Sequence, residues 1–332
     1  MSRNPSITAF LETKMSFHFT VGRVVLPIGV LAVLAACSSE FRKAGDEAPT
    51  SVGLSIASSL IEPATLIAAG DIAHCSTYKF HDDMTAVLAN DIIAVHPDAV
   101  VSVLGDNAYP DGNAIDYANC YTPTWGIPAI KSRTKPVVGN REYVVPGAAA
   151  YFDYFGVAAG DPSKGYYSYD LGAWHIIVLN DNINYRTGSP QNLWLRADLA
   201  ANPTRCTMAM WHTPRFYNGG SGTRPSQMDL WTPLYEAGVE VILGAHTHYY
   251  ERYAKNTPAG VADPVSGIRQ FLVGMGGKSI GLPTLKMWNT EMQDPSKTYG
   301  VVKFTLEPDA YSWEFVPIPG GTFRDTGREL CH

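Results

Sequence analysis

The stretch AVVSVLGDNAY, residues 99–109, joins an apolar run to a turn that carries an aspartate and a tyrosine. The run at 99–105 is short and rich in valine, which predicts a β-strand. Gly105 lets the chain bend sharply where the strand ends. Ligands gather at strand ends in α/β proteins because the loops there converge on one crevice. We therefore expect Asp106 and Tyr109 to belong to a functional site.

Four other segments have the same design, in which an apolar run leads straight into a loop with side chains that can bind metal ions. They are GDIAH (70–74), GNREY (139–143), MWHTP (210–214) and GAHTHYYER (244–252). Oxygen donors suit hard ions and imidazole suits zinc, iron, manganese or nickel, so the mixture favours a transition-metal pair over calcium. Two ions about 3.5 to 4 Å apart need a bridging carboxylate, and Asp106 is the natural bridge.

Each of these side chains has a simpler interpretation when it is taken alone. Asp71 or Asp106 could cap a helix, and Asn140 could stabilise a turn. His212 could be a hydrogen-bonded loop histidine, and Tyr109 a core residue. The joint occurrence of five such segments favours the metal site. Outside the motifs, we expect His175 to be satisfied in a strand, and four histidines to be incidental: His18, His81, His96 and His332.

The remaining pattern predicts an α/β domain that begins near Thr65. Seven further apolar runs are typical of strands, at 66–70, 136–139, 174–180, 206–211, 239–244, 269–273 and 300–306. Apolar residues at three- and four-residue spacing predict helices at 76–93, 189–201 and 226–237. Ser189 followed by Pro190 is a typical helix start, whereas Pro233 weakens the prediction for the last helix.

The N-terminal segment has the pattern of a bacterial lipoprotein signal. Arg23 precedes an apolar run that ends in LAAC at 34–37, too short to span a membrane. We expect a signal peptide at 1–36, a flexible linker at 37–63 and a catalytic domain at 64–332, with Met15 a candidate start and a short buried helix the alternative. A lipid on Cys37 would then anchor an exported protein in the periplasm or at the cell surface.

Four cysteines remain after Cys37, and an oxidising compartment would favour their pairing as two disulfides. Three pairings are possible. We favour Cys75 with Cys120, which both follow strands that lead to the expected site, and Cys206 with Cys331, which would pin the C-terminus. The spacing of a zinc knuckle is absent, so structural zinc is the weaker interpretation.

Composition limits the classes of function. The net charge is -6 and no run of lysine or arginine forms a basic stripe, so we expect no nucleic-acid partner, and no protein partner is evident. The P-loop, the G-x-S-x-G elbow and the G-x-G-x-x-G turn are absent from the sequence, which disfavours kinases, serine hydrolases and Rossmann dehydrogenases. A small phosphorylated substrate fits a metal pair best.

The five segments, taken in their order along the chain, resemble the calcineurin-like metallophosphoesterases, from about residue 68 to 277. Tyr109, three residues after Asp106, and HTHYYER at 246–252 point to the purple acid phosphatase branch. The resemblance implies a four-layer α/β/β/α sandwich of two mixed sheets flanked by helices. It also implies iron(III) together with iron, zinc or manganese. The implied ligands are Asp71, Asp106, Tyr109 and His248 for one ion, and Asp106, Asn140, His212 and His246 for the other.

The resemblance fails at Arg141, where the family has a histidine that contacts phosphate and assists the leaving group. Arginine cannot donate a proton at useful pH, but it can hold phosphate by paired hydrogen bonds. We expect His74 or Tyr217 to supply the proton. The implied activity is hydrolysis of phosphate esters by a metal-bound hydroxide. The alternatives are a phosphodiesterase or nucleotidase of the same fold, and a phosphate- or partner-binding lipoprotein with impaired catalysis.

Overall fold

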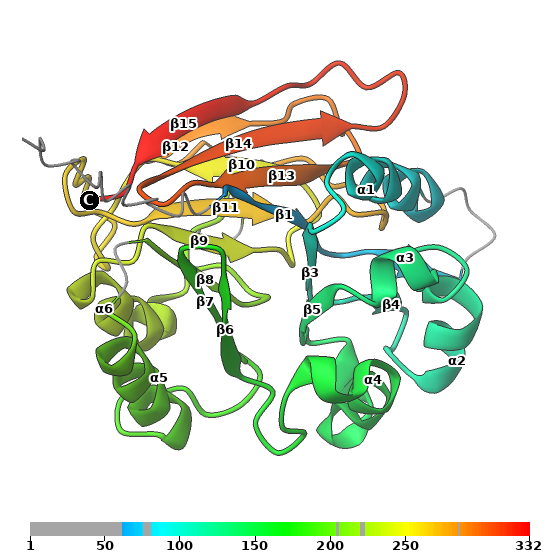
Figure 1. Ribbon diagram of the computed structural model, residues 1–332, viewed down its shortest axis with the longest axis horizontal. Helices are drawn as coiled ribbons and strands as arrows, with labels where there is room; N and C mark the ends of the chain where they lie inside the picture. Colours follow the sequence, from blue (N-terminus) through cyan, green and yellow to red (C-terminus); the bar gives the residue numbers. More distant parts are fainter. Residues whose placement is uncertain (1–61, 76–80, 204–205, 220–222, 285) are drawn as a thin grey trace, which may run out of the picture. The chain divides into compact units, whose positions relative to one another are not determined.

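The computed structural model describes residues 62–75, 81–203, 206–219, 223–284 and 286–332, which belong to the compact unit Ser58–His332 (Figure 1). The predicted signal peptide, Cys37 and almost all of the predicted linker lie outside the described residues. So do residues 76–80, where a helix is expected to begin. Within the described ranges, no helix is long and apolar enough to cross a membrane.

Two mixed sheets form the centre of the domain. The strands of the six-stranded sheet, in spatial order, are β15 (Thr326–Leu330), β14 (Ala310–Pro317), β13 (Gly300–Leu306), β1 (Ala64–Ala69), β3 (Val100–Leu104) and β5 (Thr134–Val137). The seven-stranded sheet has the order β12 (Thr290–Gln293), β10 (Tyr250–Tyr253), β11 (Arg269–Val273), β9 (Val241–Gly244), β8 (Thr207–Met210), β7 (Trp174–Val178) and β6 (Tyr167–Leu171).

The parallel strands of each sheet lead into the predicted loops. Strands β1, β3 and β5 run parallel, as do β7, β8, β9 and β11. Beyond β1 and β3 the chain forms a two-stranded parallel ribbon of β2 (Ala73–His74) and β4 (Ala108–Tyr109). The loops that carry the expected donors therefore start from neighbouring strand ends.

Helices cover the outer face of each sheet. They are α1 (Asp82–Val95), α2 (Ala114–Asp116), α3 (Pro128–Lys131), α4 (Ala149–Phe155), α5 (Pro190–Ala201) and α6 (Met228–Glu236), and a π-helix occupies Tyr117–Tyr121. Figure 1 shows α5 and α6 grouped on one side, apart from α1, α3 and α4. The Ser189 side chain caps α5 by accepting a hydrogen bond from the backbone of Asn192, as its sequence predicts.

Three apolar clusters show the order of the layers. One cluster joins the facing sides of the two sheets, for example Leu66 of β1 and Val178 of β7. The next residue of β1, Ile67, points the other way and packs with Ala89 of α1 in a second cluster. The third cluster joins the outer side of the seven-stranded sheet to α5 and α6. This confirms the predicted four-layer α/β/β/α arrangement.

Most predicted elements are present, with differences at their ends. All eight expected strands occur, with bounds within two residues of those predicted. The expected helix at 226–237 is shorter, because a 3₁₀ turn at Pro225–Gln227 precedes α6, and Pro233 lies inside α6 without ending it. The described part of the first helix begins at Asp82 and runs two residues beyond the predicted end.

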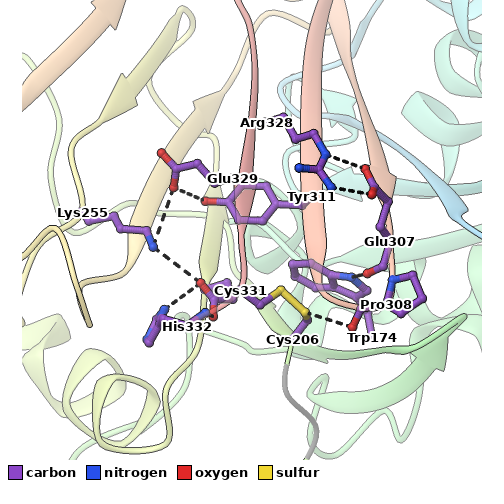
Figure 2. The surroundings of a disulfide bond; sticks show 11 residues. Trp174, Cys206, Lys255, Glu307, Pro308, Tyr311, Arg328, Glu329, Cys331 and His332 are labelled. Atoms are coloured by element: carbon purple, nitrogen blue, oxygen red, sulfur yellow. Dashed lines mark hydrogen bonds and ion pairs between the residues drawn. A yellow bond between two sulfur atoms is a disulfide. The ribbon is translucent and has the colours of Figure 1, made fainter.

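Both expected disulfides are present, Cys75–Cys120 and Cys206–Cys331. The second joins the residue before β8 to the segment after β15, and so links the two sheets covalently (Figure 2). Backbone hydrogen bonds hold the same segment: Cys331 N donates to Asp309 O at 2.9 Å, and His332 N donates to the buried Glu240 at 2.6 Å. The last strand is therefore fixed at its C-terminal end.

Candidate metal centre

The loops after β1, β3, β5, β8 and β9 bring together all seven side chains that the sequence predicts as metal ligands. Asp71 and Asp106 follow the first two strands, and Asn140 follows β5. His212 follows β8, and His246 and His248 follow β9. The donors come from both sheets, so the centre lies where the strand ends of the two sheets meet.

The Tyr109 hydroxyl contacts the other three side chains of the first group of predicted metal ligands. It donates to Asp71 Oδ1 at 2.6 Å and lies 3.0 Å from Asp106 Oδ2. His248 Nε2 lies 3.2 Å from the same hydroxyl and 3.4 Å from Asp71 Oδ1. Three oxygen donors and one imidazole nitrogen thus point at one another.

The second group of donors meets on the other side of Asp106. His212 Nε2 lies 3.3 Å from Asp106 Oδ1. His246 Nδ1 lies 2.9 Å from Asn140 Oδ1 and 3.3 Å from His212 Nε2. Asp106 uses one carboxylate oxygen toward each group, which is the position that a bridging ligand requires.

Hydrogen bonds from outside the cluster orient these donors. His212 Nδ1 lies 2.8 Å from Leu104 O, and His248 Nδ1 lies 3.0 Å from Ser279 O, so each ring turns its Nε2 inward. This is the usual arrangement of metal-binding histidines. Asp71 Oδ2 accepts a hydrogen bond from His246 N at 2.7 Å. The donor set and its orientation therefore fit a pair of metal ions.

Backbone strain is concentrated at the same place. Asp71, Asp106 and His246 have φ values of 55°, 50° and 69°, in the left-handed region that non-glycine residues seldom adopt. Such conformations cost about 1 to 3 kcal/mol each and persist where the surrounding structure imposes them. Three of the seven predicted ligands are held this way, which indicates that the fold positions these side chains at a cost in stability.

Two glycines of the motifs are required by close packing. Gly105 has a φ of 86°, and a Cβ there would lie 2.7 Å from His212 Nδ1. A Cβ on Gly139 would overlap the backbone nitrogen of Asp106. The sequence indicates only that Gly105 lets the chain bend sharply, and it does not reveal that a Cβ would lack space at either position. In the structure, the neighbouring loops and ligands occupy that space.

Glu142 supports the candidate centre through its hydrogen bonds, and the sequence interpretation missed it. Its buried carboxylate accepts hydrogen bonds from the backbone N–H groups of Asp106, Asn107 and Gly139 at 3.0, 2.7 and 2.7 Å. It thereby ties the loop after β3 to the loop after β5. Burial and the charge of Asp106 raise the pKa of Glu142 to about 7. The acid that follows Arg141 in GNREY was visible in the sequence, but its role depends on loops 36 residues apart.

Burial and neighbouring charges shift the pKa values of the predicted ligands, often in opposite directions. Burial would raise the pKa of Asp106, but the neighbouring His212 lowers it below its ordinary value. Burial would lower the pKa of His212, but the charge of Asp106 raises it. Burial, Asp71 and Asp106 all raise the pKa of Tyr109, so its phenol keeps its proton. A metal ion would compete with these protons for the same atoms.

The three candidates for phosphate binding and proton transfer all lie beside the donors. Arg141 is partly exposed, and its Nε lies 4.0 Å from Asp106 Oδ2. The ring of His74 stacks near that of Tyr109, with 6.0 Å between the centroids. Burial, Lys278 and Arg141 lower the pKa of His74. Tyr217 lines a cavity of about 590 Å³ together with His246 and His248.

Comparison with known proteins gives a family. Residues 61–250 match the calcineurin-like phosphoesterase family. Purple acid phosphatase 18 of Arabidopsis thaliana is 28% identical over 152 residues, which cover 44% of this chain and 33% of that relative. The chain thus spans about a third of that relative's length.

Solved structures share the fold. The purple acid phosphatase PPD1 from yellow lupin (Lupinus luteus) seeds has a TM-score of 0.69 at 17% identity, over 80% of this chain and 53% of the lupin chain. GAP50 of Plasmodium, described as the anchor in the inner membrane complex, has a TM-score of 0.65 at 13% identity, over 81% and 89% of the two chains. At these identities the likeness shows the fold alone. Because the family match covers more than half of its residues, this chain belongs to the calcineurin-like phosphoesterase family, with purple acid phosphatases among its relatives.

Proposed function

We propose that the chain is a metal-dependent hydrolase of phosphate esters with a dinuclear centre. The observation that carries the proposal is the position of Asp106, whose two carboxylate oxygens face two separate groups of donors. Asp71, Tyr109 and His248 complete the first group, and Asn140, His212 and His246 complete the second. Iron(III) with iron, zinc or manganese suits these oxygen and imidazole donors.

The chain's own residues would orient the substrate and the reacting water. When bound, a metal pair supplies Lewis-acid charge that acidifies water and binds phosphate oxygens. Arg141, partly exposed at the edge of the centre, would hold phosphate oxygens by paired hydrogen bonds and offset the charge that develops on them. Glu142 would hold the loops that carry Asp106 and Asn140 in fixed positions relative to each other. His74 or Tyr217 would protonate the leaving group.

Two other functions of the same fold have specific support. Arg141 in place of a histidine favours a binding protein with impaired catalysis, and GAP50, with the same fold, is described as an anchor. The open cavity beside His246 and His248 would also admit the second ester group of a diester, as a phosphodiesterase or nucleotidase requires. The complete donor set favours the phosphatase over the binding protein.

We also propose that the protein is exported. Two disulfides in one domain are typical of proteins that fold in an oxidising compartment. The signal peptide and the lipid on Cys37 stay predictions from the sequence.

The test is an assay of the purified protein, loaded in turn with iron, zinc or manganese, on p-nitrophenyl phosphate and on a bis-ester. We expect faster turnover of the monoester, and Asp106→Asn should lose both turnover and metal. Asp153→Asn, an exposed change of the same chemistry in α4, is the control and should keep both. If the wild-type protein retains both metals and hydrolyses neither ester, the binding function is correct instead.

A further inference from the structure

A glycine-rich loop after β11 places Lys278 beside the candidate metal centre. The loop reads GMGGKS at residues 274–279 and lies outside the five donor-bearing segments. Its backbone packs against the loop after β1: Gly276 N donates to Gly70 O at 3.0 Å, and Lys278 N donates to Asp71 O at 2.9 Å. A Cβ on Gly274 would lie 2.7 Å from Asp71 Oδ2, so a glycine there permits the approach.

The Lys278 side chain lies over the face of Tyr109. Its Nζ is 4.8 Å from the centroid of the Tyr109 ring. The Arg141 guanidinium carbon is 5.7 Å from the same centroid, although Arg141 comes from the loop after β5. Two cations from separate loops therefore lie near one donor of the proposed centre.

Both cations lie over the same ring, where their like charges carry an electrostatic cost. Two like charges brought together at a partly buried site repel each other, and an anion that binds between them relieves the repulsion. The chain as a whole carries a net charge of -6, so this positive pair differs from the general surface.

We propose that Lys278 is a further substrate-binding residue, whose ammonium group binds phosphoryl oxygens together with Arg141 on the Tyr109 side of the centre. The inference rests on the proposed function for the identity of the anion. Lysine acts as a point charge that contacts phosphate oxygens in any orientation, whereas arginine fixes their direction by paired hydrogen bonds. The two residues would share the phosphate contacts left open by the missing histidine at position 141.

The test compares Lys278→Met and Lys278→Arg with the wild-type protein, after metal analysis has shown equal loading. Binding of inorganic phosphate is measured by calorimetry, and kcat and KM are measured on p-nitrophenyl phosphate. We expect Lys278→Met to weaken phosphate binding about tenfold, the loss of one charge-assisted contact, and Lys278→Arg to restore most of it. Lys131→Met is the matched control, because Lys131 also lies over a tyrosine ring, that of Tyr154 in α4, and should leave phosphate binding unchanged.

The outcomes separate this inference from the proposed function. One outcome is that the wild-type protein hydrolyses no ester while Lys278→Met binds phosphate more weakly than the wild-type protein does. In that case the phosphatase function fails and the role of Lys278 stands. Unchanged phosphate affinity in Lys278→Met would overturn the role of Lys278 even in an active enzyme. Loss of metal from Lys278→Met would also overturn it, because the lysine would then support the structure of the centre.

Discussion

Tyr109 combines three properties that seldom occur together in one side chain. It is buried, its hydroxyl contacts two carboxylates, and two cations lie over its ring. A buried phenol surrounded in this way keeps its proton unless a strong Lewis acid replaces it. Tyr109 is therefore the residue whose spectroscopic properties report most directly on the metal that binds.

Replacing Tyr109 with phenylalanine removes the phenol oxygen and keeps the ring. If this oxygen binds iron(III), Tyr109→Phe should abolish any visible charge-transfer absorption of the iron-loaded protein, which absorption spectroscopy measures. The far-UV circular dichroism should not change, because the ring still fills its place in the core. A variant that stays coloured would exclude the phenol as an iron ligand.

Replacing Arg141 with histidine tests the departure from the family pattern. Histidine can bind phosphate and also donate a proton, so we expect Arg141→His to keep turnover or to raise it by up to about tenfold. The kcat on p-nitrophenyl phosphate is the measurement. A large fall in kcat with unchanged metal content would show that arginine has a role of its own.

The sequence predicts which side chains gather at the candidate centre better than it predicts the residues that surround them. Asp71, Asp106 and His246 follow apolar runs, and strand ends of an α/β sheet converge without knowledge of the exact fold. Glu142 and Lys278 contact loops that are distant in the chain. Their roles depend on the packing of one loop against another, which no local pattern encodes.

At the scale of single elements, His175 of β7 links the edge strand β6 to helix α5 through its side chain. Its Nδ1 lies 2.9 Å from Asp170 of β6, and its Nε2 lies 2.8 Å from Asp198 of α5. As the sequence predicts, it is a buried strand histidine whose nitrogens are satisfied. The hydrogen bond with Asp198 outweighs burial and, with the help of Asp170, raises the pKa of His175.

The raised pKa of His175 makes its contribution to stability depend on pH. A histidine with a folded pKa above the unfolded value of about 6.5 contributes fully below that pH, and the contribution is lost as the pH rises through the folded pKa. His175→Gln should therefore lower the free energy of unfolding by about 1 to 3 kcal/mol at pH 5 and by less at pH 9. Urea titrations at the two pH values measure this. An equal loss at both would refute a charged His175.

The elements that the sequence missed lack a continuous apolar run. Strand β15 alternates between exposed and half-buried residues at the edge of its sheet, and β14 alternates buried aromatic residues with half-buried polar ones. Strand β10 begins within the HTHYYER segment, which the sequence predicts as a metal-binding loop and not as a strand. Strands β15, β14 and β10 all pair antiparallel with their neighbours. Antiparallel strands often have one solvated face, so a search for apolar runs finds the parallel strands more readily.

At the scale of the whole domain, the Cys206–Cys331 disulfide closes a loop of 125 residues between the two sheets. Cross-links of long loops typically stabilise a protein by about 2 to 4 kcal/mol, largely by restricting the unfolded chain. The double variant Cys206→Ser, Cys331→Ser should lose about this much free energy of unfolding. Chemical denaturation measures the loss, and a loss below about 0.5 kcal/mol would contradict this role of the bond.

The double variant should keep its metal content, because Cys206 precedes β8 and Cys331 follows the last strand, whereas the predicted ligand His212 lies beyond the opposite end of β8 (Figure 2). This result would show that stability and metal binding are separable in this domain. The strands that precede the predicted ligands are parallel strands of the two sheets: β1, β3 and β5 in one, and β8 and β9 in the other.

The most direct test of the account is a crystal structure of the metal-loaded protein with anomalous diffraction at the edges of iron, zinc and manganese. The account predicts two ions about 3.5 to 4 Å apart that share Asp106 as a ligand. Two ions that share a different bridge, a single ion, or ions bound away from Asp106 would contradict it.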